Sequence, residues 1–484
     1  MRAARIRIAQ LAVAALRVLA VGIPKAGIPG LGILSLGLAA LGGACAQREH
    51  PNLLLVTVDT LRADQLACYG GSPAVGTAMC GLADRGVRFA WALSTAPSTA
   101  PSIASIMTSQ LPRRHGVTQA ARTTLSDAVP TLAESLAGAG YDTAAFVSNP
   151  VLVRARRLDR GFAIYDDRMT RPERNRGTLE REAGATTDAA LAWLGVAREP
   201  WFLWVHFQDP HGPYEPPQAP RRRDAAGAPL LPVLTDHSGL GGIPAYQALP
   251  GLRSAAAYRQ RYQDEIRHLD IHVARLLAGA DARGRPPVVV LTADHGEALG
   301  EDGVFFAHGH SVGLDQVRVP LLVRPAPPGE PRTRSAAVST LDVAPTLLAA
   351  AGLTPPAGFE GRPLPLDAGA SASAPRPVIA QHRLRAAVVL DGVYYARDRA
   401  GFDEPVADPV SGGKLQPLPP RTARLAGDAL PAYAPADATQ ASQLETFEQA
   451  LAREIARGPA AAAADGPRLS DSDRQALRAL GYLE

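Results

Sequence analysis

Three aspartates and a histidine stand directly after apolar, strand-like runs of this sequence. Asp59 follows NLLLVTV, Asp209 follows PWFLWVHFQ, and the pair Asp294-His295 follows PPVVVLTA. Because the carboxyl ends of parallel strands meet at one edge of a sheet, where α/β proteins bind ligands, we expect these side chains to gather there. Carboxylates and imidazoles together can hold a divalent cation. An aspartate after a strand can also do no more than cap a helix, and this alternative stays open.

A segment crowded with hydroxyl groups, STAPSTAPSIASIMTSQLPRRHGV (94–117), follows another strand-like approach. It could be an ordinary loop rich in Ser, Thr and Pro, or it could supply a nucleophile to the cation site, with Thr99 as the candidate. A threonine hydroxyl is a poor nucleophile at neutral pH, but a metal would stabilise its alkoxide, as metals lower the pKa of bound water from 15.7 to about 7. The group attacked would be an ester of a tetrahedral oxyanion, whose developing charge the metal and histidines would carry.

Strand-like and helix-like stretches alternate through most of the chain. Strands are expected over 53–58, in YDTAAFVSN, in PWFLWVHFQ, over 288–292 and in VPLLVRP. Helices are expected in LAESLAGAG, in STLDVAPTLLAAAGL and directly after His295. This alternation predicts an α/β fold with a large, mostly parallel sheet flanked by helices.

The composition supports a large globular protein. Of 484 residues, 46% are hydrophobic and 20% are charged, which allows a sizeable buried core and excludes a chain that is disordered throughout. The net charge of +4 is small, and the short Arg-rich stretches at 154–160 and 221–223 contain no interleaved aromatic residues. We therefore interpret them as solvated loops and expect no nucleic-acid partner.

The first 45 residues have the pattern of a secretory signal. A basic start, MRAARIRIAQ, is followed by an apolar stretch of small residues that stops at Cys45. This resembles a bacterial lipoprotein signal in which Cys45 is lipidated; a plain secreted protein and an uncleaved anchor are the alternatives. We expect an exported protein of the periplasm or cell envelope that reaches the membrane only through this segment. Cys68 and Cys80 are expected to be free and buried, although export would permit a disulfide.

The composition shifts to Ala, Pro, Gly and Ser after about Ala370. In this last part AAVVLDGVYYARD predicts a β-hairpin with Asp-Gly at its turn, 408–440 a Pro-rich loop, and SDSDRQALRALGYLE a short final helix. The predicted organisation is a signal over 1–45, a catalytic domain over 50–370 and a C-terminal subdomain over 371–484.

The chain resembles the sulfatases of the alkaline phosphatase superfamily over residues 51–366 and in its last residues. The resemblance rests on segments that occur in the family's order: VTVDTLRADQLACYGG, TAPSIASIMTSQLPRRHGV, FLWVHFQDPHGPYEPP, LTADHGEALGEDGVFFAHG, VRVPLLVRP, STLDVAPTLLAAAGL, FEGRPLPL and the terminal LRALGYLE. It implies an alkaline-phosphatase-like α/β fold and a metal-dependent hydrolase of sulfate or phosphate esters.

The resemblance also implies roles for single residues. Asp59, Asp294 and His295 correspond to metal ligands. Thr99 takes the nucleophile position and also touches the metal. His115 matches a position near the site, where a structural role is expected.

Further roles follow for the other histidines and for one aspartate. His211 and His308 would bind the transferred group or protonate the leaving oxygen. Asp209 could join them in a second metal site, and His310 could be a ligand or a bystander. His206 points from a strand and is expected to be a core residue.

Four positions depart from the sulfatase pattern. Thr99 stands where a cysteine or serine is normally converted to formylglycine, and a threonine cannot follow that route. Ile103, Thr60 and His310 replace the usual arginine, second aspartate and lysine. Superfamily members that keep an unmodified threonine include nucleotide phosphodiesterases and enzymes that transfer lipid-derived phosphate groups. We therefore favour phospho-ester chemistry; the alternative is a catalytically inactive, sulfatase-like binding protein.

The expected cofactor is a divalent metal ion, with room for one or two. The mixed nitrogen and oxygen ligands suit zinc or manganese at least as well as calcium, the metal that the sulfatase relatives imply. The substrate is expected to be a small-molecule, glycan or lipid ester. The insertion PPQAPRRRDAAGAPLLPVL and the C-terminal part are expected to shape its pocket.

Overall fold

The computed structural model describes residues 50–465 with gaps. The gaps are 119–122, 173–178, 218–219, 221, 326–331, 368–375, 383–384, 399–405, 408–413, 416–418, 437–440 and 457–463. The predicted signal with Cys45 and the predicted final helix lie outside the described residues, and the domain boundary predicted near residue 370 falls in one of the gaps.

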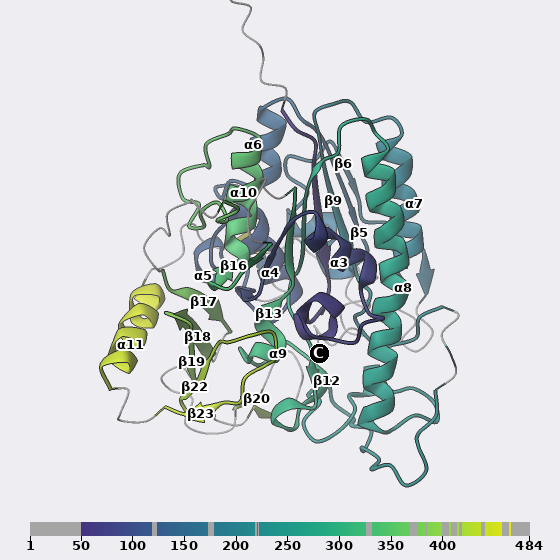
Figure 1. The fold of residues 1–484 in the computed structure, drawn as a ribbon, viewed down its shortest axis with the longest axis vertical. Coiled ribbons are helices and arrows are strands. Elements are labelled where there is room, and N and C mark those ends of the chain that lie inside the picture. Colours follow the sequence, from purple (N-terminus) through teal and green to yellow (C-terminus); the bar gives the residue numbers. More distant parts are fainter. Residues whose placement is uncertain are drawn as a thin grey trace, which may run out of the picture. The chain divides into compact units, whose positions relative to one another are not determined.

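The central element is an eight-stranded sheet (Figure 1). In order across the sheet, its strands are β15 (Thr333–Arg334), β2 (Val87–Phe89), β14 (Leu321–Arg324), β10 (Val288–Ala293), β1 (Leu53–Val58), β9 (Trp201–Phe207), β5 (Asp142–Val147) and β6 (Ile164–Asp166). From β10 to β6 all neighbours are parallel, whereas β14 runs antiparallel to both β10 and β2. The middle strands are apolar runs buried on both faces, as a two-sided parallel sheet requires. The predicted α/β fold is confirmed.

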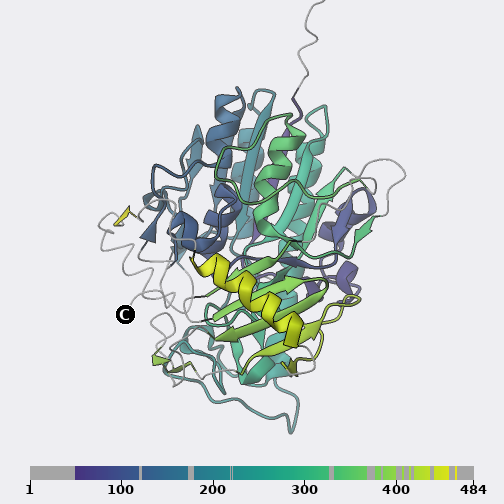
Figure 2. The ribbon, with the colours of Figure 1, turned by 90° about the vertical axis from the view of Figure 1, so that its left-hand side faces the viewer.

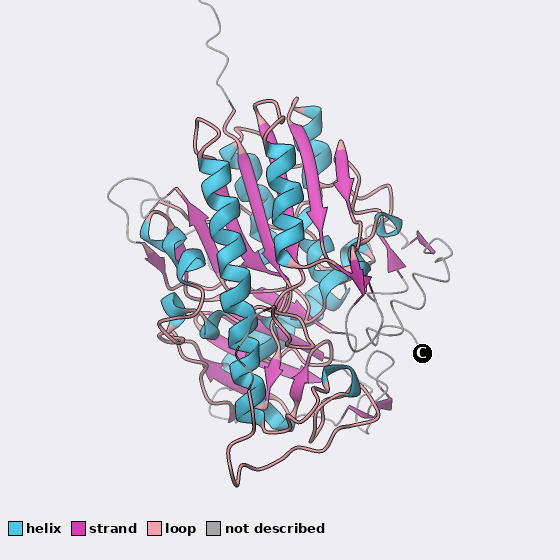
Figure 3. Cartoon of the chain, turned by 90° about the vertical axis from the view of Figure 1, so that its right-hand side faces the viewer, coloured by secondary structure: helices cyan, strands magenta, loops and turns pink. Residues whose placement is uncertain are grey.

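Helices cover both faces of this sheet (Figures 1 and 3). One face carries α3 (Thr77–Asp84), α7 (Ala183–Leu194) and α8 (Ala255–Asp281), and the other carries α4 (Thr99–Thr108), α6 (Leu132–Gly138) and α10 (Val343–Ala350). Local sequence fixes where they begin: α6 starts with a capping box between Thr131 and Glu134, and the Ser254 hydroxyl accepts the Ala257 N–H at the start of α8. Among the described helices, none is both long and apolar enough to cross a bilayer.

The chain turns back on itself after β10. It forms two short antiparallel strands, β11 (Ala298–Leu299) and β12 (Phe305–Ala307), so the helix predicted at this place is wrong. The LGEDG stretch between them holds two glycines with positive φ, a conformation that ends a helix. Asp294 is therefore not a helix cap. Asp59 is not one either, because the first helical turn after β1 has Arg62 as its N-cap.

A second, antiparallel sheet forms the C-terminal part, and α11 (Ala441–Ala456) lies across it (Figure 2). The predicted hairpin is confirmed: Asp391 and Gly392 at its turn have φ of 50° and 73°, as a tight Asp-Gly turn requires. The loop predicted over 408–440 is wrong in part, because β22 (Arg421–Arg424) and β23 (Ala434–Pro435) lie within it. The five strands are β17 (Val378–Gln381), β18 (Arg385–Leu390), β19 (Val393–Asp398), β22 (Arg421–Arg424) and β23 (Ala434–Pro435).

Cys68 and Cys80 form a disulfide, with their Cα atoms 5.5 Å apart. The prediction that they are free is therefore wrong. A short helical turn over Ala67–Tyr69 reverses the chain before α3 begins, and this brings Cys80 beside Cys68, whose N–H donates to Cys80 Sγ at 3.0 Å. The spacing of only two cysteines in the sequence does not predict this reversal of the chain, so the disulfide could not be predicted.

Removing this crosslink is expected to destabilise the fold. The double variant Cys68→Ser, Cys80→Ser should lower the free energy of unfolding by about 3 kcal/mol, because a crosslink over a short loop restricts the unfolded chain. Urea unfolding measures the difference, and wild type in a reductant serves as the control that should lose a similar amount. Identical stability of the oxidised, reduced and double-serine proteins would contradict the expectation.

Candidate active site

The predicted ligands meet at the carboxyl edge of the central sheet because of the strand order. β1 lies between β9 and β10, and Val58 at its end is in register with Phe207 and Ala293. The ladder continues one residue further, since the N–H groups of Asp59 and Asp294 donate to Phe207 O and Val58 O at 2.9 and 3.2 Å. The two aspartates therefore leave neighbouring strands side by side.

Four fully buried side chains form the centre of the site. One ligand atom each from Asp59, His206 and Asp294 lies within 4.8 Å of the others. His295 joins them, with Nε2 3.6 Å from Asp59 Oδ1 and 3.7 Å from Asp294 Oδ2. These separations leave the four side chains around a common point.

Three polar atoms in this group lack a hydrogen-bond partner. Within the described residues, Asp59 Oδ1, Asp294 Oδ2 and His206 Nε2 are all buried and unpaired. Burying two adjacent carboxylates is costly unless a positive charge compensates them. Carboxylate oxygens and imidazole nitrogens are donors for divalent cations, so the residues present fit a metal ion.

The charges of the two aspartates are coupled. Burial, together with the charge of Asp59, raises the pKa of Asp294 well above its usual value. Burial opposes the charged form of Asp59 as well, but His206, His211 and His295 outweigh it and hold the pKa of Asp59 below its usual range. Without a cation, the site therefore disfavours having both carboxylates ionised.

Thr99 is the first residue of α4, so the hydroxyl-rich segment is more than a loop. Its side chain is fully buried, and Oγ1 lies 3.3 Å from His295 Nε2. The positive end of the helix dipole is at this N-terminus, where it favours an anionic group. Thr99 thus lies beside the aspartate pair, at a place suited to a bound oxyanion.

Three histidines share one orientation. Nδ1 of His295 bonds Gly296 O at 2.9 Å, Nδ1 of His211 bonds Gly212 O at 2.8 Å, and Nδ1 of His308 bonds a Glu297 carboxylate oxygen at 3.1 Å. These oxygens only accept, so each Nδ1 carries the proton and each Nε2 has the lone pair with which an imidazole can bind a metal or take up a proton. The His308 ring is 4.6 Å from the His295 ring and 5.1 Å from the His211 ring, centre to centre.

Burial also sets the charge of His295. Burial, followed by the neighbouring His308, lowers the pKa of His295 to about 3. The imidazole is therefore neutral at physiological pH, which is the form that binds metals.

The family model for sulfatases, described simply as Sulfatase, matches residues 51–353. The chain belongs to the sulfatase family. Members of this family are ester hydrolases, and divalent metals are their cofactors. A Delta 4,5-hexuronate-2-O-sulfatase of Bacteroides thetaiotaomicron is 26% identical over 66% of this chain and 72% of that protein. A choline-sulfatase of Rhizobium meliloti is 28% identical over 63% of this chain and 68% of that protein.

Solved structures share the fold of this sulfatase-family chain. A phosphonate monoester hydrolase from Silicibacter pomeroyi matches with a TM-score of 0.63 at 21% identity, covering 84% of this chain and 96% of that chain. The structure of a putative sulfatase from Bacteroides thetaiotaomicron matches with a TM-score of 0.64 at 21% identity, covering 84% of this chain and 92% of that chain.

A buried carboxylate that the sequence analysis missed orients His308. Glu297 binds His308 Nδ1 through Oε1 and accepts the Tyr214 hydroxyl on Oε2, each at 3.1 Å. Its backbone oxygen accepts Arg62 Nη1 at 3.0 Å. The sequence feature that could have identified Glu297 is its position two residues after His295, on the same turn of chain as the predicted ligands.

Not every predicted site residue joins the cluster of this sulfatase-family protein. Asp209 lies outside the cluster of ligand atoms formed by Asp59, His206 and Asp294 in the described residues. Burial raises the pKa of Asp209 to about 6, against the opposing effect of backbone N–H groups that include that of Ala183 at the start of α7. His310 is buried next to the C-terminal sheet, where its backbone oxygen accepts Arg385 Nη1 at 2.9 Å. His115 is buried behind α4 and hydrogen-bonds Ser105 at 3.0 Å.

Two residues from neighbouring strands were not predicted as part of the site. His206 is buried as expected for a core residue, but its Nε2 lies 3.8 Å from Asp59 Oδ2. Its other nitrogen is held by Thr57 Oγ1 at 2.8 Å. Asn149, two residues after the end of β5, donates a hydrogen bond from Nδ2 to the same Asp59 Oδ2.

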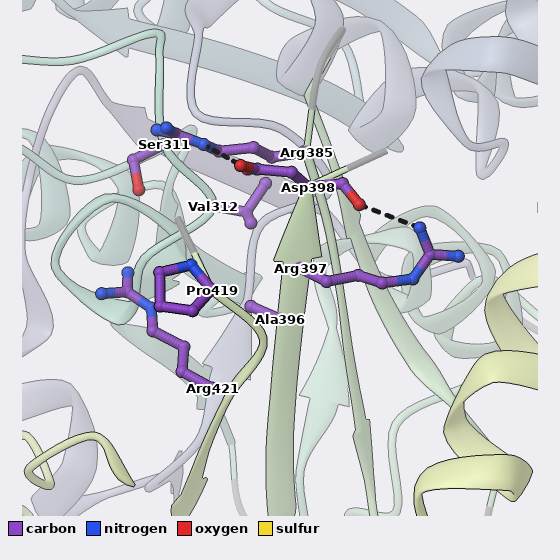
Figure 4. A pocket seen from close by; sticks show the side chains of 8 residues that line it. All are labelled: Ser311, Val312, Arg385, Ala396, Arg397, Asp398, Pro419 and Arg421. Atoms are coloured by element: carbon purple, nitrogen blue, oxygen red, sulfur yellow. Dashed lines mark hydrogen bonds and ion pairs between the residues drawn. The ribbon is translucent and has the colours of Figure 1, made fainter. Parts of the chain in front are cut away.

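A separate small pocket contains three arginines beside the segment that follows His308 (Figure 4). It is lined by Ser311, Val312, Arg385, Ala396, Arg397, Asp398, Pro419 and Arg421. Each arginine already has an acidic partner: Arg385 with Asp398 at 2.9 Å, Arg397 with Glu448 at 2.6 Å and Arg421 with Asp302 at 2.6 Å. We assign these arginines to holding the C-terminal sheet in place.

Proposed function

We propose that this protein is an exported, metal-dependent hydrolase of sulfate or phosphate-type esters with Thr99 as its nucleophile. One observation carries the proposal. His295 Nε2 is 3.3 Å from the Thr99 hydroxyl and 3.6 and 3.7 Å from unpaired oxygens of Asp59 and Asp294. A nucleophile and the ligands of a cation therefore share one buried position.

The proposed ligands are Asp59, Asp294, His295 and the Thr99 hydroxyl, with His206 as a further nitrogen donor. A divalent cation bound to them would stabilise the Thr99 alkoxide and the charge on the attacked group. Zinc or manganese is favoured by the mixed donor set, with calcium as the alternative. We propose a single cation, because Asp209 is not part of the ligand cluster that the described residues form around Asp59, His206 and Asp294.

The protein residues divide the reaction between them. The Thr99 hydroxyl gives up its proton to solvent, and Oγ1 forms a bond to the sulfur or phosphorus while the bond from that atom to the ester oxygen breaks. The leaving oxygen takes a proton from Nε2 of a protonated His308 or His211. Water then cleaves the threonine ester, which releases the anion and restores the hydroxyl.

Phospho-ester chemistry is the preferred form of this proposal. Thr99 cannot become formylglycine, the nucleophile of the usual sulfatases, so the reaction that needs no modification is favoured. The names of the curated relatives, a hexuronate sulfatase and a choline-sulfatase, point to sulfate esters instead. Reaction with defined esters of each acid tells the two anions apart.

Mass spectrometry tests both the nucleophile and the anion. The protein, loaded in turn with zinc, manganese or calcium, is exposed briefly to 4-nitrophenyl phosphate, bis(4-nitrophenyl) phosphate, 4-nitrophenyl phenylphosphonate and 4-nitrophenyl sulfate. We expect an otherwise unmodified Thr99 that gains a phosphoryl-type group. No adduct and no turnover with any metal would instead favour the inactive, sulfatase-like binding protein.

The location of the protein is part of the proposal. We propose export through residues 1–45 with lipid anchoring at Cys45, a catalytic domain over 50–370 and a C-terminal subdomain over 371–484. The disulfide between Cys68 and Cys80 supports export, because such bonds persist in oxidising compartments.

Replacing Glu297 tests the proton donor. In Glu297→Gln the buried charge that stabilises a protonated His308 is lost, so kcat on an alkyl ester should fall about 10- to 100-fold. A 4-nitrophenyl ester should lose much less, because its leaving oxygen needs no proton. Tyr214→Phe, which keeps the carboxylate, is the matched control. Equal losses on both esters would contradict the assigned role of His308.

A further inference from the structure

An open cavity of about 410 Å³ lies between α11, β17 and the chain that follows α4. Apolar side chains make up much of its wall: Leu111, Leu341, Val378, Ile379 and Ala450. Among the described residues that line it, none belongs to the proposed active site. The cavity is large enough to receive several side chains of a binding partner.

This cavity interrupts an apolar cluster that joins α11 to the chain beyond α4. Leu111 and Leu341 belong to the same buried cluster as Ile379 of β17 and as Phe447 and Leu451 of α11. Apolar side chains that border an unfilled volume lose contacts on that side, which costs stability. A segment that carries apolar side chains would complete the cluster.

Two stretches of chain outside the described residues adjoin the cavity in sequence, and neither has a large apolar side chain. Residues 368–375, directly before Arg376 on the cavity rim, contain only Ala, Gly, Ser and Pro. Residues 457–463, directly after α11, contain only Arg, Gly, Pro and Ala. The apolar part of an occupant must therefore come from elsewhere.

The last residues of the sequence, 466–484, have the apolar side chains that these stretches lack. We call this segment, which also lies outside the described residues, the tail. Its sequence predicts a short helix, and its apolar residues recur three or four positions apart, as on one face of such a helix. They are Ala476, Leu477, Leu480 and Leu483. A stripe of this kind is stable only when another surface covers it.

The tail begins within reach of the cavity. Asp465 of β24 (Ala464–Asp465) pairs with Thr123 of β4 (Thr123–Thr124). The chain from Leu111 to Thr123 has as many residues as the chain from Asp465 to Leu477, and part of it is coiled into the short helix α5 (Pro112–His115). An extended tail can therefore return from β4 to Leu111 at the cavity wall.

The rim of the cavity offers one unpaired positive charge. Glu360 and Arg376 on the rim already have ion-pair partners. Arg453 is exposed and forms no ion pair with a described residue. The apolar stripe of the tail is flanked by Asp473 and Glu484, so either end of it can bring a carboxylate to this guanidinium.

We propose that the tail binds in this cavity through Leu477, Leu480 and Leu483, with an acidic residue of the tail beside Arg453. The tail then connects α11 and β17 to the chain that follows α4. This contact within one chain does not depend on the proposed hydrolase function.

Photochemical crosslinking of the full chain identifies the occupant. An aliphatic amino acid with a diazirine group replaces Leu480, and mass spectrometry locates the crosslinks. We expect links within one chain to peptides that contain Leu341, Ile379 or Ala450. The same probe in place of Arg478, on the opposite face of the predicted helix, should give at least about tenfold less of these products. Links between two chains, links to other parts of the chain or no links from position 480 would overturn the proposal.

Proteolysis tests the same contact without a probe. Leu480→Asp should raise the rate of trypsin cleavage after Arg474 at least about tenfold, because cleavage follows the population of the released tail. Arg478→Asp introduces the same side chain on the opposite face and should leave the rate nearly unchanged. Ala450→Trp fills the cavity from its wall and should release the tail as Leu480→Asp does. Equal rates in Leu480→Asp and Arg478→Asp would overturn the proposal.

Discussion

Thr99→Ala is expected to abolish turnover, with a loss of about 10⁶-fold in kcat, as follows when a nucleophile is removed. The Thr99 hydroxyl is fully buried at the first residue of α4, and its Oγ1 lies 3.3 Å from His295 Nε2. We assign the role of nucleophile to this hydroxyl alone and expect no neighbouring hydroxyl to take it over. Steady-state hydrolysis of the best substrate from the ester panel measures the loss. The substitution removes little volume, and the protein should remain folded.

Two further variants test whether the loss of turnover is due to the Thr99 hydroxyl itself. Thr99→Ser keeps the hydroxyl and should retain measurable turnover. Ser98→Ala removes the adjacent hydroxyl, whose side chain makes no capping hydrogen bond to α4, and should leave kcat nearly unchanged. More than about a tenth of wild-type activity in Thr99→Ala would exclude it as the nucleophile.

Asp294→Asn is expected to separate stability from cation binding. In the absence of metal the variant should be more stable than wild type, because the buried repulsion with Asp59 is removed and the new amide can donate to it. With a cation at about 100 times its Kd, wild type should gain about 2.7 kcal/mol and the variant much less. Urea unfolding with a chelator and with zinc, manganese or calcium measures both effects, and hydrolysis should be lost.

Asp209→Asn provides the matched comparison, since it too changes a carboxylate just after a strand into an amide. Its carboxylate lies outside the ligand cluster of the described residues, so the full gain from the cation should remain. A loss of that gain in Asp209→Asn would place Asp209 in a metal site after all. A wild type whose stability responds to none of the three cations would contradict the proposed site.

Much of the site could be predicted because parallel strands end at one edge. The polar residues after β1 and β10 were recognisable, and the register of these strands brings Asp59 and Asp294 together. Thr99 was identified by resemblance and by the spacing of its segment. The α/β fold followed from the alternation of apolar runs with helix-like stretches.

Other parts of the site could not be predicted because they depend on the direction in which a side chain points from its strand or turn. β9 is buried on both faces, so its sequence does not say which face His206 meets, and only the register with β1 shows that it faces Asp59. Asn149 follows a strand as the aspartates do, yet an amide there is also a common turn residue. The helix predicted after β10 failed at the glycines of its LGEDG turn.

The strand order has a consequence for how the protein matures. Thr60 and Asp294 are hydrogen-bonded to each other, although 234 positions separate them. Contacts of such high sequence separation form slowly, and the proposed ligands are together only once β1 and β10 have paired. Since metal binding is coupled to folding, we expect the ion that completes the fold to depend on the metals in the compartment where folding ends.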